Sequence, residues 1–265
     1  MPISGVPDVT VITKIRSFFK REVPQFNFPE GMRIYAVGDV HGCLELLKRL
    51  EGRIAESARD CPLTTGVIFL GDYIDRGPDV AGVIEHLSRG TFAGLPARFL
   101  LGNHEDIFLA ALGESPLIRE WLRWGGLATL ASYRVMLPQI ADPAERNQVI
   151  ADAIRRAMPP HHIDFLERLE VSIQHGDYMF VHAGIRPGRP LDRQSRSDLL
   201  SIREPFLSSP KTLPCRVVHG HSVAFDVQAT PCRIGIDTGA YATGRLSALL
   251  LEAERTEIVA VSDGR

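Results

Sequence analysis

The chain has 265 residues, of which 45% are apolar, and its formal net charge is −2 at neutral pH. This length and apolar content suit one large α/β domain with a sizeable core. The near-neutral charge excludes the strongly basic surface of typical nucleic-acid-binding proteins, so we expect no nucleic-acid partner. No apolar run approaches the roughly 18–20 residues that a membrane-spanning helix needs.

The cysteines are few and form no Cys-x-x-Cys pair. They are Cys43, Cys61, Cys215 and Cys232. Isolated cysteines of this kind are typical of free thiols in a reducing compartment. The N-terminus also lacks an apolar signal core followed by small residues. We therefore expect a cytoplasmic protein, while the oligomeric state stays open.

Residues 1–30 form an N-terminal arm with a composition of its own. Basic and apolar side chains recur at helical spacing over residues 11–23, and Pro24, Pro29 and Gly31 then interrupt the pattern. The pattern predicts a short basic helix, which either packs on its own domain or binds a membrane surface or a partner. The main folded domain is expected over residues 31–265.

Apolar runs and helical patterns alternate after this arm. The predicted strands cover residues 34–37, 67–70 and 98–101, and the predicted helices cover residues 44–54 and 80–87. Continuous apolar runs are typical of strands buried on both faces, and a spacing of about thirty residues is typical of successive βαβ units. We therefore expect parallel strands whose carboxyl ends carry the ligand-binding loops.

Residues 106–170 break this rhythm. Trp121 and Trp124 lie in helical patterns that Gly125 and Gly126 interrupt, which predicts a helical insertion over or beside the site. The chain after it is rich in predicted strands, at residues 178–181, 216–218, 233–236, 246–251 and 258–261. We expect these to form a second sheet packed on the first. The predicted fold class is thus α/β, a two-sheet β-sandwich flanked by helices.

Five short runs place metal-type ligands among glycines or small residues, each after an apolar stretch. They are GDVHG at 38–42, GDYIDRG at 71–77, GNHE at 102–105, VHAG at 181–184 and GHS at 220–222. The six ligand candidates in them are Asp39, His41, Asp72, Asn103, His182 and His221. Carboxylate, amide and imidazole groups suit manganese, iron or zinc, and two such cations about 3.5–4 Å apart activate water for phosphoryl transfer. His219 is a second imidazole beside His221 and stays an alternative ligand.

The order GDxHG, GDxxDRG and GNHE, followed by two later histidines, resembles the phosphoprotein phosphatase family of the calcineurin-like metallophosphoesterases. The ending IDTGAY at 236–241 and the GHS run are similar to its bacterial and phage serine/threonine phosphatases. The resemblance extends from about Arg33 to about Leu251. It implies the metallophosphoesterase fold and two divalent metal ions, Mn²⁺ before Fe or Zn. It also implies that Asp72 bridges both metals, and it favours His221 over His219.

The same resemblance implies four further roles. His104 would be the general acid that protonates the leaving oxygen, and Asp75 would orient it. Arg76 and Arg203 would bind the substrate phosphate. Ser201 departs from the family, which often has tryptophan at this position two residues before Arg203.

These roles predict hydrolysis of a phosphomonoester, with phosphoserine or phosphothreonine in a protein or peptide as the substrate. A hydroxide bridging the two metals is the expected nucleophile, since no Cys or Ser lies in a nucleophile motif. One alternative is a symmetrical diadenosine tetraphosphate hydrolase of the same fold. Such enzymes resemble GDxxARG and GNHD, whereas Asp75 and Glu105 occupy those positions here and favour the phosphatase. The other alternative, a non-catalytic phosphoprotein-binding module, is disfavoured because every expected ligand is present.

Overall fold

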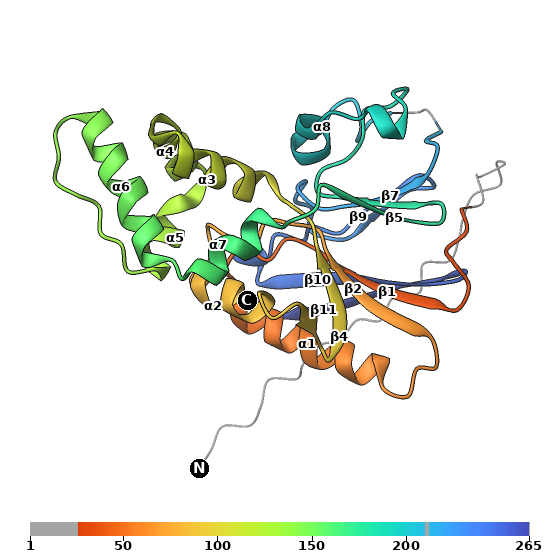
Figure 1. Cartoon of the computed structure of the whole chain (residues 1–265). Helices are drawn as coiled ribbons and strands as arrows, with labels where there is room; N and C mark the ends of the chain where they lie inside the picture. Colours follow the sequence, from red (N-terminus) through yellow and green to blue (C-terminus); the bar gives the residue numbers. More distant parts are fainter. Residues whose placement is uncertain (1–25, 210–211, 265) are drawn as a thin grey trace, which may run out of the picture.

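The computed structural model describes residues 26–209 and 212–264 and contains two β-sheets packed face to face (Figure 1). The first sheet has the strand order β11-β10-β1-β2-β4-β3, and the second has the order β5-β6-β7-β9-β8. Helices α1 and α2 cover the outer face of the first sheet, and α8 lies beyond the second (Figure 1). The predicted α/β sandwich is confirmed, whereas the helix predicted at 11–23 lies outside the described residues.

The first half of the larger sheet has the predicted βαβ pattern. Its elements are β1 (Met32–Val37), α1 (Leu44–Ala58), β2 (Thr64–Phe69), α2 (Val80–Leu87), β3 (Thr91–Phe92) and β4 (Leu95–Phe99). Strands β1, β2 and β4 are parallel, and β3 pairs with β4 in the antiparallel sense. The helical spacing predicted for α1 corresponds to a buried stripe that includes Leu47, Leu50 and Ile54.

The last two long strands join this sheet. β10 (Arg245–Glu252) pairs antiparallel with β1, and β11 (Arg255–Ser262) pairs antiparallel with β10. The prediction that residues 246–251 and 258–261 belong to the second sheet is therefore wrong. An apolar run predicts that a segment is a strand, but its pairing depends on which strand edge the rest of the fold leaves free. Here the free edge is that of β1.

The second sheet is smaller. Its strands are β5 (Ser172–His175), β6 (Tyr178–Val181), β7 (Arg216–His219), β8 (Gln228–Ala229) and β9 (Arg233–Gly235). Strands β6, β7 and β9 are parallel to one another. The connections of this half contain η3 (Leu191–Arg193), α8 (Arg196–Ser201) and α9 (Ala240–Thr243).

The side chains of β1 point alternately to the two faces of the first sheet and so contribute to two separate apolar clusters. Ile34 and Ala36 of β1 pack between the two sheets, whereas Tyr35 and Val37 pack in the cluster that contains α1 and α2. Successive strand residues point to opposite faces, so a strand covered on both faces is apolar throughout. The outer face of the second sheet has its own apolar cluster, which includes Phe206.

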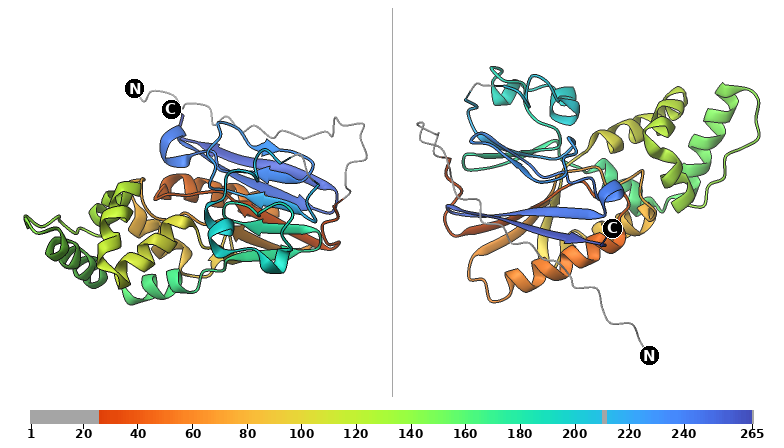
Figure 2. Two further views of the ribbon diagram at one scale, coloured as in Figure 1. Left: turned by 90° about the horizontal axis from the view of Figure 1, so that it is seen from above. Right: turned by 180° about the vertical axis from the view of Figure 1, so that it is seen from behind.

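A helical insertion separates β4 from β5. It consists of α3 (Asn103–Gly113), η1 (Ser115–Leu117), α4 (Ile118–Trp121), η2 (Leu122–Gly126), α5 (Leu127–Ser132), α6 (Pro143–Ala157) and α7 (Pro160–Glu167). All three views place it beside the sandwich (Figures 1 and 2). Gly125, with φ 116°, separates the helical turns before it from those after it, as the Gly-Gly pair predicts.

Two expectations concern the chain as a whole. All four cysteines lie in the described residues, and none forms a disulfide. No helix within residues 26–209 and 212–264 combines the length and apolar character required to cross a bilayer.

Candidate metal centre and active site

The five glycine-rich runs meet at one place, where strands from both sheets end. The loop after β1 contributes Asp39 and His41, the loop after β2 contributes Asp72, and Asn103 begins α3. The ends of β6 and β7 bring His182 and His221 from the second sheet. The site thus lies across the sandwich, and neither sheet could form it alone.

Several residues of these loops have a left-handed backbone. The non-glycine members are His41 (φ 42°), Asp72 (φ 53°), Asp75 (φ 68°), Arg76 (φ 65°) and His221 (φ 62°). This conformation is unfavourable for residues with a Cβ and concentrates at functional sites, where surrounding contacts fix it. Here it directs polar side chains toward a common centre.

Asp72 lies between two groups of possible metal ligands. One group is His41, Asp72 and His104, and the other is Asp72, His182 and His221. Its Oδ2 lies 3.4 Å from His41 Nε2, and its Oδ1 lies 3.4 Å from His182 Nε2. Two carboxylate oxygens facing two histidines are the arrangement that a bridging ligand requires.

Asn103 and Asp39 complete this cluster. Asn103 Oδ1 lies 2.9 Å from His182 Nε2 and 2.8 Å from His221 Nδ1. The backbone N–H of His221 donates to Asp39 Oδ2 at 3.0 Å, whereas Asp39 Oδ1 and His221 Nε2 are buried without a hydrogen-bond partner in the described structure. Because such orphaned atoms are rare in folded proteins, they favour an ion at this place.

Electrostatics favours cations here. Burial and the neighbouring carboxylates of Asp237 and Asp72 raise the pKa of Asp39 well above its usual range. Burial opposes ionisation of Asp72 as well, but His182, His104 and His41 around it bring its pKa well below the usual value. A buried cluster of carboxylates with few hydrogen-bond donors needs a positive charge, so the residues present fit two divalent cations.

The structure distinguishes the two neighbouring histidines. Burial and the charge of His182 lower the pKa of His221 to about 3, so its imidazole is neutral and can bind a metal at neutral pH. His219 is also buried, with its pKa lowered to about 4, but its ring packs 5.1 Å from that of Phe206 and its Nδ1 lies 3.1 Å from the carbonyl oxygen of Gly220. The ligand cluster thus includes His221 and leaves His219 outside.

His104 and Asp75 are in direct contact. His104 Nδ1 lies 2.7 Å from Asp75 Oδ2, and neither side chain is exposed by more than 1%. Two side chains that the sequence did not identify hold Asp75: the indole N–H of Trp121 donates to Oδ1 at 3.0 Å, and the hydroxyl of Thr129 donates to Oδ1 at 2.6 Å. Both come from the helical insertion, far from Asp75 in the chain.

Glu105 is a second residue whose position only the structure reveals. Its carboxylate accepts hydrogen bonds from the backbone N–H groups of Asp72, Tyr73, Ile74 and Gly102 at 2.8–3.1 Å. Glu105 therefore fixes the loop that carries Asp72. The GNHE motif places Glu105 next to the site but gives no sign of this role.

Both predicted phosphate-binding arginines lie at the cluster. Arg76 places Nη1 3.2 Å from His41 Nε2 and Nη2 2.8 Å from His104 Nε2, and its guanidinium lies 4.8 Å from the centre of the Tyr241 ring. Arg203 donates from Nη2 to the carbonyl oxygen of His221 at 3.4 Å and is exposed. The Arg76 guanidinium thus lies beside the ligand group that contains His41, and the Arg203 guanidinium lies beside the group that contains His221.

One further cluster of metal-type side chains lies elsewhere. Glu85 Oε2 on α2 is 2.9 Å from His161 Nε2 and 3.0 Å from His162 Nε2 on α7, and Tyr133 contacts the other nitrogen of His162. The side chain of Glu85 is 52% exposed. Ion pairs and hydrogen bonds account for these contacts, so we assign no metal to this group.

The family model for calcineurin-like phosphoesterases matches residues 32–241. The chain belongs to this family. The matched range contains all six ligand candidates together with Asp75, Arg76, His104 and Arg203.

The three curated relatives described next are all named bis(5'-nucleosyl)-tetraphosphatases. A symmetrical bis(5'-nucleosyl)-tetraphosphatase of Paracidovorax citrulli is 30% identical over 161 residues, which are 61% of this chain and 47% of that protein. The chain thus spans about half the length of the first relatives it matches. A symmetrical bis(5'-nucleosyl)-tetraphosphatase of a Janthinobacterium species is 26% identical and aligns over 86% of this chain and 95% of its own length. An asymmetrical one of Bacillus anthracis is 25% identical over 82% and 90%.

Solved structures agree on the fold. One that its name assigns to the diadenosine tetraphosphatases has a TM-score of 0.59 and 26% identity, covering 88% of this chain and 95% of its own. A cold-active protein tyrosine phosphatase shares the fold, with a TM-score of 0.53, 18% identity and coverage of 90% and 80%. The expected metallophosphoesterase family is thus confirmed, but the three curated relatives described above are named tetraphosphatases, and none of the three is named a serine/threonine phosphatase.

Proposed function

We propose that this chain is a metal-dependent hydrolase of bis(5'-nucleosyl) tetraphosphates. The observation that carries the reaction class is the shared carboxylate of Asp72 between two groups of ligands, which suits two-metal phosphoryl transfer. The substrate class rests on the names of relatives that align over nearly their whole length. The sequence motifs alone favour a serine/threonine phosphatase over a tetraphosphate hydrolase, so this proposal reverses that preference.

The residues of the site have two kinds of role, metal binding and phosphate binding. Asp39, His41, Asp72, Asn103, His182 and His221 would hold two divalent cations, with Mn²⁺ the first to test. When bound, the cations would supply the Lewis acidity that activates water and offsets the charge of the phosphoryl oxygens. Arg76 and Arg203 donate hydrogen bonds to those oxygens and fix the orientation of the substrate for in-line attack.

His104 has two possible tasks. The Arg76 guanidinium can only donate hydrogen bonds, so His104 Nε2 accepts one from it. The imidazole proton then lies on Nδ1, which donates a hydrogen bond to the Asp75 carboxylate. In this state His104 directs Arg76 toward the phosphate. Once the substrate attracts the guanidinium, Nε2 becomes free to take up a proton from water, and the imidazolium so formed can donate that proton to the leaving oxygen.

The contact between His104 and Asp75 supports a second candidate function, a phosphoserine or phosphothreonine phosphatase. A serine or threonine alkoxide is a poor leaving group and needs a well-oriented proton donor, whereas a nucleotide phosphate leaves more readily. Asp75 is held by Trp121 and Thr129, so the donor is firmly oriented. A phosphoprotein or phosphopeptide would then be the substrate.

A direct comparison tests these proposals. We would measure kcat/KM for diadenosine tetraphosphate and for a phosphothreonine peptide at one Mn²⁺ concentration. The proposed function predicts faster cleavage of the dinucleotide, and a clear preference for the peptide would replace it with the second candidate. Identifying the nucleotides released from diadenosine tetraphosphate would show which bond is cleaved. Symmetrical hydrolysis gives only ADP, and asymmetrical hydrolysis gives AMP and ATP.

A further inference from the structure

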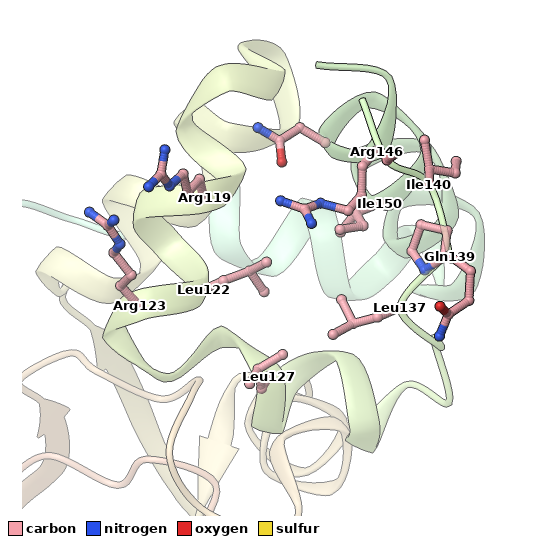
Figure 3. A pocket seen from close by; sticks show the side chains of 12 residues that line it. Arg119, Leu122, Arg123, Leu127, Leu137, Gln139, Ile140, Arg146 and Ile150 are labelled. Carbon is pink, nitrogen blue, oxygen red and sulfur yellow. The ribbon is translucent and has the colours of Figure 1, made fainter. Parts of the chain in front are cut away.

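An open pocket of about 660 Å³ lies in the helical insertion (Figure 3). Helices α4 and α5 with η2 form one side, and α6 with the segment 137–141 forms the other. Its volume falls within the roughly 300–1,000 Å³ of typical small-molecule sites. None of the motif residues of the metal centre lines it, so the site described above does not explain it.

The walls of the pocket expose apolar side chains. Leu127 is 52% exposed and Leu137 is 49% exposed, and Leu122 and Ile150 add to the apolar lining. Figure 3 shows these four leucine and isoleucine side chains around the cavity. A concave apolar surface of this kind favours a ligand with a flat, apolar body.

One amide opens onto the cavity. Asn147 lines the pocket and is only 7% exposed, and its side chain forms no hydrogen bond with a described residue. Its amide atoms remain accessible from the cavity, so they can bind water or a ligand. Gln139 adds a second amide to the same lining. Two amides can pair with the donor and acceptor edge of a nucleobase.

Three arginines give the pocket a positive charge. Arg119, Arg123 and Arg146 line it, and none of them forms an ion pair with a described residue. Arg146 extends from α6 into the cavity, while Arg119 and Arg123 lie along the opposite helix (Figure 3). The side chain of Asp142, just before α6, caps this helix by accepting a hydrogen bond from the backbone N–H of Glu145 at 2.8 Å. Unpaired guanidiniums are suited to phosphate groups.

One segment connects the pocket with the reaction centre. Leu122 and Arg123 of η2 line the pocket, while the ring of Trp124 lies 5.7 Å from the ring of His104. The carbonyl oxygen of Gly125 accepts the backbone N–H of Arg76 at 3.3 Å. The segment 122–125 thus contacts the pocket through its first two residues and the site through its last two.

We propose that this pocket is a subsite for the nucleoside phosphate that extends away from the cleaved phosphate. The base would pack on the leucines and pair with Asn147 and Gln139, and the arginines would bind the phosphate chain. This proposal rests on the proposed function, because it supplies a site for the second half of a dinucleotide. A small aryl phosphate has no such half and cannot use the pocket.

Two variants on the same helix test the subsite. Arg146→Ala removes a pocket guanidinium, and Arg156→Ala removes an exposed arginine of α6 that does not line the pocket. Arg146→Ala should raise KM for diadenosine tetraphosphate by about tenfold or more, as expected for a lost charge-assisted hydrogen bond. Its kcat/KM for an aryl phosphate should equal that of the wild type, and Arg156→Ala should match the wild type on both substrates. Equal effects of Arg146→Ala on the two substrates, or none, would overturn the proposal.

A binding measurement separates this proposal from the proposed function. ADP would be titrated calorimetrically into wild type, Arg146→Ala and Arg156→Ala, with inorganic phosphate saturating the metal centre. The subsite predicts that Arg146→Ala binds ADP at least about tenfold more weakly than Arg156→Ala. Such a loss in an enzyme that does not cleave the dinucleotide would uphold the pocket and refute the proposed function. Equal ADP affinity in all three proteins would refute the pocket, whatever the enzyme cleaves.

Discussion

Replacing Thr129 by valine would test how the helical insertion supports the active site. The Thr129 hydroxyl donates to Asp75 Oδ1 at 2.6 Å and accepts from the backbone N–H of Asp75 at 3.0 Å. Both residues are fully buried. Valine has nearly the same shape, so the change removes two hydrogen bonds while leaving the packing in place.

The contacts set the expected size of the effect. A hydrogen bond to a charged group contributes about 1.5–3 kcal/mol, and a buried N–H left without a partner costs about 1–3 kcal/mol. Together they predict a loss of roughly 2.5–6 kcal/mol in the free energy of unfolding, a large share of the roughly 5–15 kcal/mol typical of a folded domain. Thr129→Ser keeps the hydroxyl and loses one methyl group, which costs about 1 kcal/mol.

Urea unfolding of the wild type and both variants would measure these differences. The rate on an alkyl phosphate, which needs the proton donor, should also fall by roughly tenfold to a hundredfold in Thr129→Val, because Asp75 would no longer hold the His104 ring in place. Thr129→Ser should retain most of the rate. If the two variants agree within about 1 kcal/mol and in rate, the support that we assign to Thr129 does not exist.

The remaining predictions concern the metal centre. Asp72→Asn should lose bound metal and turnover together, because one charge shared by two ligand groups disappears; elemental analysis with full metal content and activity would contradict the shared role. His104→Asn should slow an alkyl phosphate by roughly 10²–10⁴-fold and an aryl phosphate much less, because only the alkoxide needs a proton; equal losses would argue against a general acid. His221→Gln should lower the metal content, and His219→Gln should leave it unchanged. In the metal-free protein the pKa of His221, about 3, and that of His219, about 4, lie below the ordinary value of 6.5. The unfolded chain therefore binds more protons, so stability present above pH 6.5 should fall as the pH drops toward about 4. The urea midpoint at several pH values measures this, and a constant midpoint would contradict it.

The ligand candidates could be found in the sequence because each lies in a short local pattern. An apolar run followed by a glycine turn places a side chain at a strand end, and parallel strands bring such ends to one edge. All six candidates lie together there, and Asp75, His104, Arg76 and Arg203 lie beside them; their role as metal ligands stays a prediction. The motifs and the relatives favour different substrates: Asp75 and Glu105 favour a phosphoprotein, whereas the names of the curated relatives favour a dinucleoside tetraphosphate.

The sequence by itself determined the metallophosphoesterase family, most strand and helix segments and the candidate site residues. Only the tertiary structure decided that β10 pairs with β1 and β11 with β10, that Trp121 and Thr129 hold Asp75, and that three arginines line one pocket. The physical reason is the separation along the chain between residues that are in contact. Local patterns report backbone conformation and burial within a few residues, whereas Trp121 and Thr129 contact Asp75 across 46 and 54 residues of chain. Such contacts depend on how the insertion packs on the sandwich, and no local pattern encodes that packing.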